Sequence, residues 1–290
     1  MNNTMQGKIC LITGGTNGIG KRTAQVLAGM GATVVIAGRN ATKTTQVVKE
    51  IRANSGNPNV DSLLGDLSSQ REVRHLADEF KRKYQHLHVL LNNAGGFFMR
   101  RQLSGDGIEM TFALNHLASF LLTDLLLDTI KASAPARIIN VSSGAHTSGK
   151  IEFDNLQGER EYGPRAYDNS KLANILFTME LARRLEGTGV TVNALHPGFV
   201  ATGFAKNNGK VIAALVSIIT PLVARSPAKG AQTSIYLASS PSVEGITGKY
   251  FYDSRETSPA PQASDTLVAR KLWEVSAEMV QLPHGRSITS

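Results

Sequence analysis

Thr13-Gly14-Gly15-Thr16-Asn17-Gly18-Ile19-Gly20 lies between a short apolar run and a helical pattern. Glycines at such a strand-to-helix turn permit a tight bend and let the backbone approach a pyrophosphate closely. The helix that follows adds unpaired N–H groups and a partial positive charge at its N-terminus. Glycine-rich turns are common, but this one follows the first strand of a strand–helix–strand pattern. We therefore predict that it binds dinucleotide phosphates through Gly14, Thr16, Asn17, Gly18, Ile19 and Gly20.

Short apolar runs alternate with longer amphipathic ones along the chain. This alternation predicts an α/β fold with a single Rossmann-type, doubly wound parallel sheet and helices on both faces. Right-handed crossovers place the carboxyl ends of all parallel strands at one edge, where ligands bind in such folds. The predicted strands are Ile9–Thr13, Thr33–Ala37, Asp61–Gly65, Val89–Asn92, Arg137–Val141, Thr191–Leu195 and Lys249–Tyr252, and the predicted helices are Ile19–Met30, Thr42–Asn54, Gln70–Tyr84, Gly107–Ala132, Ala166–Glu186 and Ala228–Ser239.

The chain shows no internal repeat, low-complexity segment or linker, so we expect one domain over residues 1–290. Hydrophobic residues make up 41% of the chain, which is ordinary for a soluble protein with a sizeable core. The most apolar stretch, Val211–Ala224, is too short to span a bilayer and contains Pro221. A substrate lid around residues 199–226, a buried helix and a membrane-surface contact are the alternatives for it.

The formal net charge is +8. The basic residues are spread out rather than gathered into the run of five to eight that marks a nucleic-acid patch, so we expect no nucleic-acid partner. The charge is either a solvated basic surface or an attraction to a polyanionic cofactor. Since no His, Cys, Asp or Glu cluster has metal-ligand spacing, we predict no catalytic metal.

Two features indicate a reducing compartment. The single cysteine, Cys10, cannot form an intramolecular disulfide, and its apolar neighbours indicate a buried, inert thiol. The polar stretch Met1–Gln6 contains no signal or targeting pattern. We therefore expect a cytoplasmic protein with at most peripheral membrane contact.

The residues after the second predicted strand indicate the cofactor. NAD sites usually place an acidic residue about 20 positions after the glycines, to bind the ribose 2′-hydroxyl. No Asp or Glu occurs between Gly14 and Lys49, and the strand ends at Arg39 instead. A guanidinium there would pair with a 2′-phosphate, which a carboxylate would repel. We predict NADP(H) over NAD(H), with Arg39 as the contact, Lys21 and Arg22 as further candidates, and a plain surface role for Arg39 as the alternative.

Tyr167 and Lys171 lie four residues apart at the start of a helical pattern, and therefore on one helix face. Only about one free tyrosine in a thousand is ionised at neutral pH, and an adjacent ammonium favours the ionised form. Such a tyrosine can exchange a proton with an alcohol or ketone. The pair alone is weak evidence, but Ser142-Ser143 follows a predicted strand and therefore lies at the ligand edge, where a serine can bind the substrate oxygen or merely cap a turn.

Taken together, the motifs resemble the short-chain dehydrogenase/reductase family over essentially the whole chain. They occur in the family's order and spacing. The matching residues are Thr13–Gly20, Asp66-Leu67, Asn92-Asn93-Ala94-Gly95, Asn115, Ser143, Tyr167 with Lys171, and Pro197-Gly198 through Thr202.

The resemblance implies a role for each matching residue. Tyr167 is expected to be the general acid/base, and Lys171 to hold the nicotinamide ribose and lower the Tyr167 pKa. Ser143 is expected to orient the substrate, and Asn115 to hold a water for a proton relay to Lys171. The implied cofactor contacts, besides Tyr167 and Lys171, are Asp66 and Leu67 at the adenine, Asn93, Ala94 and Gly95 beside the adenosine ribose, and Val200 and Thr202 at the nicotinamide.

Longer matches resemble the retinol dehydrogenase-like subgroup; these are Val141–His146, Asn155–Gly158, Ser170–Arg184 and Gly248–Asp253. That subgroup generally prefers NADP(H) and acts on apolar alcohols, aldehydes and ketones, which implies an NADP-dependent alcohol dehydrogenase or carbonyl reductase. Family members usually form dimers or tetramers, often through the helices corresponding to Gly107–Ala132 and Ala166–Glu186. The resemblance thus implies a homodimer or homotetramer, although the apolar run Phe120–Ile130 is equally explained as core.

A catalytically silent NADP(H)-binding sensor or scaffold is the alternative function, because a fold alone does not fix an activity. A sensor needs no proton-relay residues, so the presence of all four catalytic residue types favours the enzyme. His146 has no carboxylate placed beside it in the sequence, and we assign it a structural role rather than that of a base.

Overall fold

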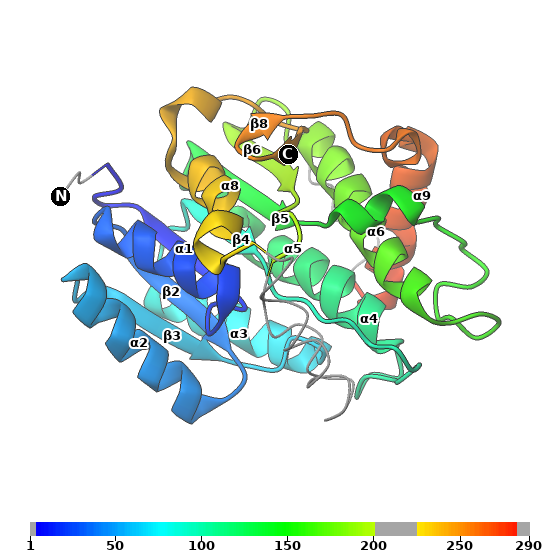
Figure 1. The fold of residues 1–290 in the computed structure, drawn as a ribbon, viewed down its shortest axis with the longest axis horizontal. Helices are drawn as coiled ribbons and strands as arrows, with labels where there is room; N and C mark the ends of the chain where they lie inside the picture. Colours follow the sequence, from blue (N-terminus) through cyan, green and yellow to red (C-terminus); the bar gives the residue numbers. More distant parts are fainter. Residues whose placement is uncertain (1–3, 201–224, 283–290) are drawn as a thin grey trace.

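The computed structural model describes residues 4–200 and 225–282. Its centre is an eight-stranded sheet in the order β3-β2-β1-β4-β5-β6-β7-β8 (Figure 1). All neighbouring strands pair in parallel except β7 and β8. The strands are β1 (Ile9–Thr13), β2 (Thr33–Gly38), β3 (Val60–Leu64), β4 (Val89–Asn92), β5 (Ala136–Val141), β6 (Val190–Leu195), β7 (Tyr250–Tyr252) and β8 (Arg255–Glu256).

Helices cover both faces of this sheet (Figure 1). One face packs against α1 (Gly18–Gly29), α2 (Ala41–Ser55) and α8 (Pro227–Ser239). The other packs against α3 (Gln70–Lys83), α5 (Ala118–Lys131) and α6 (Pro164–Arg184), and α9 (Thr266–Met279) packs on α6.

The alternation of side chains along β1 explains the two layers. Cys10 and Ile12 point into the core beneath α1 and α2, whereas Leu11, between them, joins the core beneath α3 and α5. All three are fully buried. Successive strand residues face opposite sides, so a sheet with helices on both faces requires continuous apolar runs such as Ile9–Thr13.

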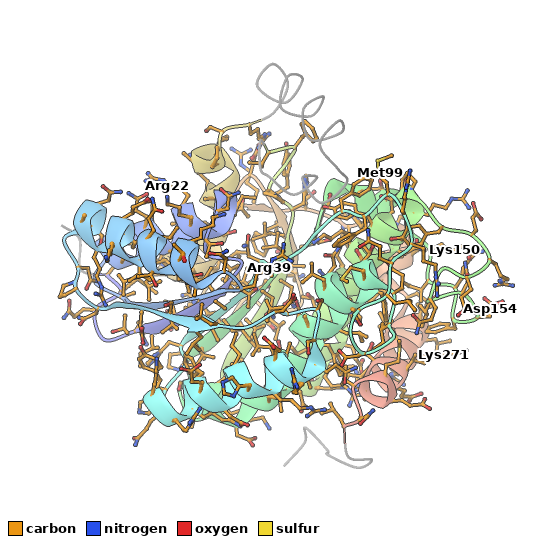
Figure 2. All side chains as sticks on the ribbon, turned by 90° about the horizontal axis from the view of Figure 1, so that it is seen from below. Arg22, Arg39, Met99, Lys150, Asp154 and Lys271 are labelled. Carbon is orange, nitrogen blue, oxygen red and sulfur yellow. The ribbon has the colours of Figure 1, made fainter. Side chains whose placement is uncertain are left out.

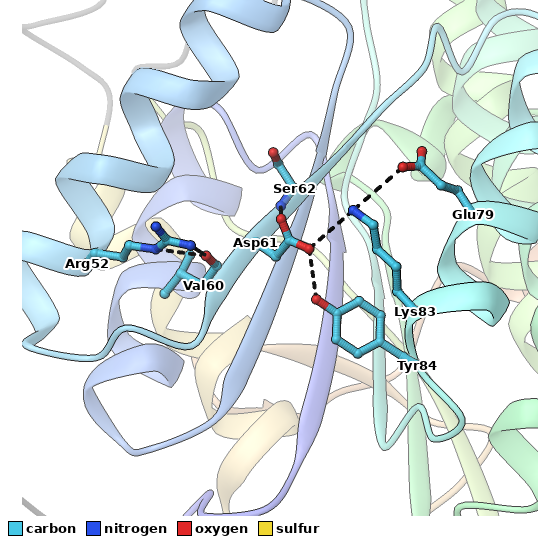
Figure 3. A network of polar contacts seen from close by, with 7 residues as sticks. All are labelled: Arg52, Val60, Asp61, Ser62, Glu79, Lys83 and Tyr84. Carbon is cyan, nitrogen blue, oxygen red and sulfur yellow. Dashed lines mark hydrogen bonds and ion pairs between the residues drawn. The ribbon is translucent and has the colours of Figure 1, made fainter.

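The outer strand β3 is fixed by polar contacts from both neighbouring helices (Figure 3). The Arg52 guanidinium of α2 donates to the Val60 carbonyl at 2.6 and 3.0 Å. From the end of α3, the Tyr84 hydroxyl donates to the Asp61 carboxylate at 2.9 Å, and Lys83 lies 3.4 Å from the same oxygen. These bonds hold β3 in place at the edge of the sheet, and the loop that contains Asp66 begins where this strand ends.

The predicted strands and helices are confirmed to within one or two residues, with three corrections. The sheet is not purely parallel, because the short antiparallel strand β8 closes one edge. The predicted helix Gly107–Ala132 begins only at Met110 and contains a π-helical turn, Ala113–Leu117, between α4 (Met110–Phe112) and α5. The C-terminal helix α9 was not predicted.

The apolar run Phe120–Ile130 belongs to the core, where most of its side chains are buried. By length and composition, Met110–Lys131 is the one stretch of the described residues that qualifies as a membrane span, but it is mostly buried inside the fold, as core helices are. Thr202, the stretch Val211–Ala224 and most of the predicted lid lie outside the described residues. The predicted cytoplasmic location stays a prediction.

Candidate active site

A cavity of about 1000 Å³ opens at the carboxyl ends of the parallel strands. Its walls are the loops that follow β1, β2, β3, β4, β5 and β6, together with the start of α6. This is the edge at which the sequence placed the ligand site. Of the predicted site residues, those lining the cavity are Gly14, Thr16, Asn17, Gly18, Ile19, Arg39, Asp66, Leu67, Asn93, Ala94, Gly95, Ser143, Tyr167, Lys171 and Val200.

Gly20 does not line the cavity but is needed to build it. A Cβ atom at Gly20 would lie 2.5 Å from both the Asn93 Nδ2 atom and the Gly14 carbonyl oxygen. Gly14 and Gly18 have φ angles of +64° and +50°, in the left-handed region that favours glycine. The loop therefore folds tightly against the β4 loop, and α1 begins at the cavity with no acidic residue in its first turn. This cradle fits a pyrophosphate.

The wall next to the glycine loop is fixed by Thr13 at the end of β1. Its hydroxyl accepts hydrogen bonds from the Asn93 and Ala94 backbone N–H groups at 2.9 and 3.0 Å. The Asn93 amide in turn donates to the Thr13 carbonyl at 2.8 Å. The β1 and β4 loops are thus bonded to each other, which leaves the Ala94 and Gly95 backbone as a firm surface beside the cavity.

Arg39 lies exposed after β2 and lines the end of the cavity next to α2. Lys43, in the first turn of α2, lines the same end, and no acidic residue occupies that turn. Two cations and a helix N-terminus therefore gather where a 2′-phosphate would carry its charge. The sequence interpretation missed Lys43, because only the fold places it beside Arg39.

Lys21 and Arg22, the other predicted phosphate contacts, point elsewhere. Lys21 pairs with Glu50 of α2, and Arg22 bonds Gln25 on its own helix. Neither lines the cavity. Figure 2 shows Arg39 near the centre of its view and Arg22 toward the outside of α1. Lys21 links α1 to α2, and Arg22 forms a surface contact on α1; neither contacts the cavity.

Tyr167 and Lys171 project from the same side of α6 into the cavity. The Lys171 Nζ atom donates to the Val141 carbonyl at the end of β5, at 3.1 Å. Burial lowers the Lys171 pKa to about 8. Burial raises the Tyr167 pKa to about 12, and the Ser143 hydrogen bond opposes the rise. The expected lowering of this pKa by Lys171 stays a prediction.

Ser143 begins the short 3-10 helix η2 (Gly144–Ser148) directly after β5. Its hydroxyl oxygen accepts from the Ala145 N–H at 3.2 Å and is hydrogen-bonded to Tyr167. Ser142, by contrast, is buried and donates to the Lys171 carbonyl at 2.7 Å. The two serines therefore separate as predicted: Ser143 borders the tyrosine, and Ser142 ties β5 to α6.

Asn115 is fully buried in the π-helical turn and does not line the cavity. Its amide donates to the Gly96 carbonyl at 3.0 Å and to the Ser170 hydroxyl at 2.9 Å, and its oxygen accepts from the Gly96 N–H at 2.8 Å. A Cβ atom at Gly95 would lie 3.1 Å from the Asn115 oxygen and 3.4 Å from the Lys171 Nζ atom. Asn115 and Lys171 are therefore neighbours across Gly95.

The far end of the cavity is aromatic. His196, after β6, stacks on Tyr252 with a ring-centroid distance of 4.1 Å, and both line the cavity. Phe199 is 60% exposed at the same rim, so an apolar surface is open to solvent there. Burial lowers the His196 pKa to about 4, which keeps the ring neutral. Sequence reasoning missed His196 and Tyr252 as site residues, although His196 adjoins the matched Pro197-Gly198 and Tyr252 lies within the matched stretch Gly248–Asp253.

Within residues 4–200 and 225–282, no group of three or more His, Cys, Asp or Glu side chains is placed to hold a metal ion. Apart from the Asp66 carboxylate and the His196 ring, the polar groups that line the cavity are amide, hydroxyl, ammonium and guanidinium groups, which suit an anionic organic ligand.

Residues 8–212 match the family model described as "short chain dehydrogenase". The chain belongs to the short chain dehydrogenase family. Its relatives include retinol dehydrogenase 14 of Mus musculus, 44% identical over 95% of this chain and 86% of the relative, and retinol dehydrogenase 11 of Homo sapiens, 43% identical over 96% and 87%. The retinol dehydrogenase-like subgroup is thereby confirmed.

Solved structures of the family share the fold. A protein from Mycobacterium paratuberculosis matches with a TM-score of 0.76 at 30% identity over 95% of this chain and 94% of that one. The Pseudomonas aeruginosa RhlG/NADP active-site complex matches with a TM-score of 0.69 at 28% identity over 87% and 96%. This short chain dehydrogenase is therefore an oxidoreductase by family, built on the family's Rossmann-type sheet.

Proposed function

We propose that this short chain dehydrogenase uses NADP(H) to interconvert apolar alcohols with aldehydes or ketones, with Tyr167 as the general acid/base. One observation carries the proposal: a phenol and an amine from one face of α6 border the same cavity as a glycine-built phosphate cradle. We further propose that the whole chain acts as a single domain, because the loops at the end of one sheet and the start of α6 together line this cavity.

The dinucleotide would lie along the sheet edge. Gly14 to Ile19 would bind the pyrophosphate, Arg39 and Lys43 the 2′-phosphate, and Asp66, Leu67, Asn93 and Ala94 the adenosine. Two supports favour the phosphorylated form: the cations at the α2 end of the cavity, and the NADP held by the structural relative RhlG. When bound, NADP(H) gives or takes the hydride, and all proton transfer is left to the protein.

Proton transfer falls to Tyr167, which lies between Ser143 and Lys171. In the reducing direction its hydroxyl gives a proton to the substrate oxygen, and in the oxidising direction the phenolate takes one. The Ser143 hydroxyl binds the same oxygen and fixes its distance from the phenol. Lys171 supplies a positive charge beside the phenolate as it forms, and it would hold the nicotinamide ribose when the cofactor is bound. Asn115 holds the backbone of Gly95 and Gly96, which borders Lys171, and thereby supports the expected proton relay to Lys171.

The substrate would lie at the aromatic end, between Tyr167 and the His196–Tyr252 stack. This surface and the exposed Phe199 ring favour an apolar molecule with a single polar group. The names of the relatives, retinol dehydrogenases 11 and 14, are consistent with such a substrate.

The test is a panel of apolar aldehydes and ketones assayed with NADPH and with NADH. We expect turnover of at least one compound, a preference for NADPH, and a loss of about 100-fold or more in kcat in Tyr167→Phe without loss of NADPH binding. A fully active Tyr167→Phe protein overturns the proposed mechanism. Absence of turnover across the panel, with NADPH still bound, favours the sensor or scaffold function instead.

A further inference from the structure

His146 is buried directly behind the Ser143 loop and does not line the cavity. Its Nδ1 atom lies 2.8 Å from the Ser143 carbonyl oxygen. Its Nε2 atom accepts a hydrogen bond from the Ala260 backbone N–H at 3.0 Å. The ring therefore bridges the serine to the segment that precedes α9, more than 100 positions along the chain.

These two contacts fix the tautomer of the ring. A backbone N–H only donates, so Nε2 must carry the lone pair that faces Ala260. The proton of the neutral ring then lies on Nδ1, where it points at the Ser143 carbonyl, which only accepts. Burial lowers the His146 pKa and keeps the ring neutral. The titratable groups packed against it are Tyr250, whose ring lies edge-on at 5.0 Å, and, beyond Tyr250, His196. The Tyr250 hydroxyl also lies 3.3 Å from Nδ1, where it can accept a longer, second hydrogen bond from the Nδ1–H that points at the Ser143 carbonyl.

The same segment holds the rest of the loop. The Gln262 amide donates to the Thr147 carbonyl at 3.0 Å and to the Gly149 carbonyl at 3.3 Å. With the His146 bridge, the Ser143–Gly149 loop is bonded from its first residue to its last. The Ser143 carbonyl belongs to the peptide that joins Ser143 to Gly144, one peptide before the Ala145 N–H that holds the serine hydroxyl, so the His146 contact restrains the backbone of Ser143 itself.

We propose that His146 is a positioning residue, whose Nδ1–H orients Ser143 toward Tyr167 from outside the cavity. The inference rests on the proposed function, because orientation of Ser143 matters only if that serine binds the substrate oxygen. It assigns the C-terminal segment around Ala260 a role at the reaction centre.

The tautomer is tested without any reaction, by nitrogen NMR of the full chain labelled with 15N-histidine at pH 7.5. We expect the His146 proton on Nδ1, with Nε2 unprotonated. A proton on Nε2 would overturn the inference, whatever the protein proves to catalyse.

The role is tested with two matched variants. The amide nitrogen of Asn is as many bonds from the backbone as His Nδ1, so His146→Asn keeps a donor for Ser143. The amide of Gln reaches the Nε2 position, so His146→Gln keeps an acceptor for Ala260 only. We expect His146→Gln to lose about tenfold in kcat, the loss of one neutral hydrogen bond, with KM changed far less. His146→Asn is expected to stay within about threefold of the parent.

Both variants should bind NADPH as the parent does and should differ little from each other in Tm. Equal kcat for the two variants, whether both high or both low, would overturn the positioning role. If Tyr167→Phe is inactive while the two variants match, only this inference fails. If Tyr167→Phe stays active, the proposed function fails, and the NMR result alone decides the tautomer.

Discussion

The Lys171 Nζ atom lies 5.6 Å from the centroid of the Tyr167 ring, over the face of the ring. Lys171 is almost fully buried, and its ammonium hydrogen-bonds the Val141 carbonyl. No carboxylate contributes to the shift of its pKa, which is due to burial alone. A charge held in this way beside a phenol serves proton transfer, but the fold loses stability by keeping it there.

Replacement of this lysine should therefore stabilise the protein. Burial lowers the Lys171 pKa from 10.5 to about 8, so the folded state disfavours protonated lysine. The cost of the buried ammonium is absent above pH 10.5. It grows as the pH falls and is complete below about pH 8, where it lowers the free energy of unfolding by about 3 kcal/mol at most. We expect Lys171→Met to unfold at a higher urea concentration than the parent at pH 7. The difference between the two urea midpoints should be smaller at pH 10.

The control is Lys150→Met, which removes an exposed lysine (Figure 2) that pairs with Glu152. It should change the free energy of unfolding by less than about 0.5 kcal/mol at either pH. If Lys171→Met is no more stable than Lys150→Met at pH 7, the burial cost assigned to Lys171 is wrong.

Arg39 should decide cofactor preference. Arg39→Ala removes one cation from the 2′-phosphate end of the cavity, and we expect the Kd for NADPH to rise about 10- to 100-fold, the loss of a charge-assisted hydrogen bond. The Kd for NADH should change little, because NADH lacks the 2′-phosphate. Fluorescence titration of both cofactors measures this. Arg22→Ala removes the same charge outside the cavity and should leave both constants unchanged; a matching loss there would indicate long-range charge attraction rather than contact.

Two glycines of α1 differ in the space that surrounds them. Gly20→Ala places a methyl group 2.5 Å from the Gly14 carbonyl and the Asn93 amide, so the loop must shift. We expect cofactor binding to fall at least tenfold, together with a lower Tm. Gly29→Ala meets nothing within 4 Å and should raise stability by about 0.5 to 1 kcal/mol with binding intact. Equal behaviour of the two variants would contradict the tight loop.

Trp273 anchors α9 to the core. Its ring lies 4.8 Å from the Phe120 ring and 5.8 Å from the Phe177 ring, and the Arg184 guanidinium lies 4.2 Å above it. Trp273→Ala is expected to cost about 2 to 4 kcal/mol in the free energy of unfolding. Leu267→Ala, on the same helix and 75% exposed, should cost less than about 0.5 kcal/mol. Urea titration of both proteins compares them directly.

The phosphate loop and the Tyr167–Lys171 pair were predictable because their chemistry is contained in a few adjacent residues. Glycine spacing fixes a turn, and a separation of four fixes a helix face. Strand positions were equally accessible, since β1 and β4 are continuous apolar runs between two helical layers.

The features that could not be predicted from the sequence depend on packing. The pKa values of Tyr167 and Lys171 follow from burial, which exists only once the cavity walls assemble. Lys43 became a site residue because β2 and α2 bring it beside Arg39. The helix α9, in contrast, has an N-cap residue in the sequence. The Asp265 side chain caps it by accepting hydrogen bonds from the Leu267 and Val268 N–H groups.

The position of α9 bears on quaternary assembly. The helix lies along α6, and its Ser276 hydroxyl bonds His116 in the interior at 2.8 Å, while Trp273 covers Phe120 and Phe177. The family resemblance predicts that the long helices α5 and α6 meet a second subunit. Because α9 covers part of α6, a homodimer built through α6 would have to use a part of that helix that α9 leaves open.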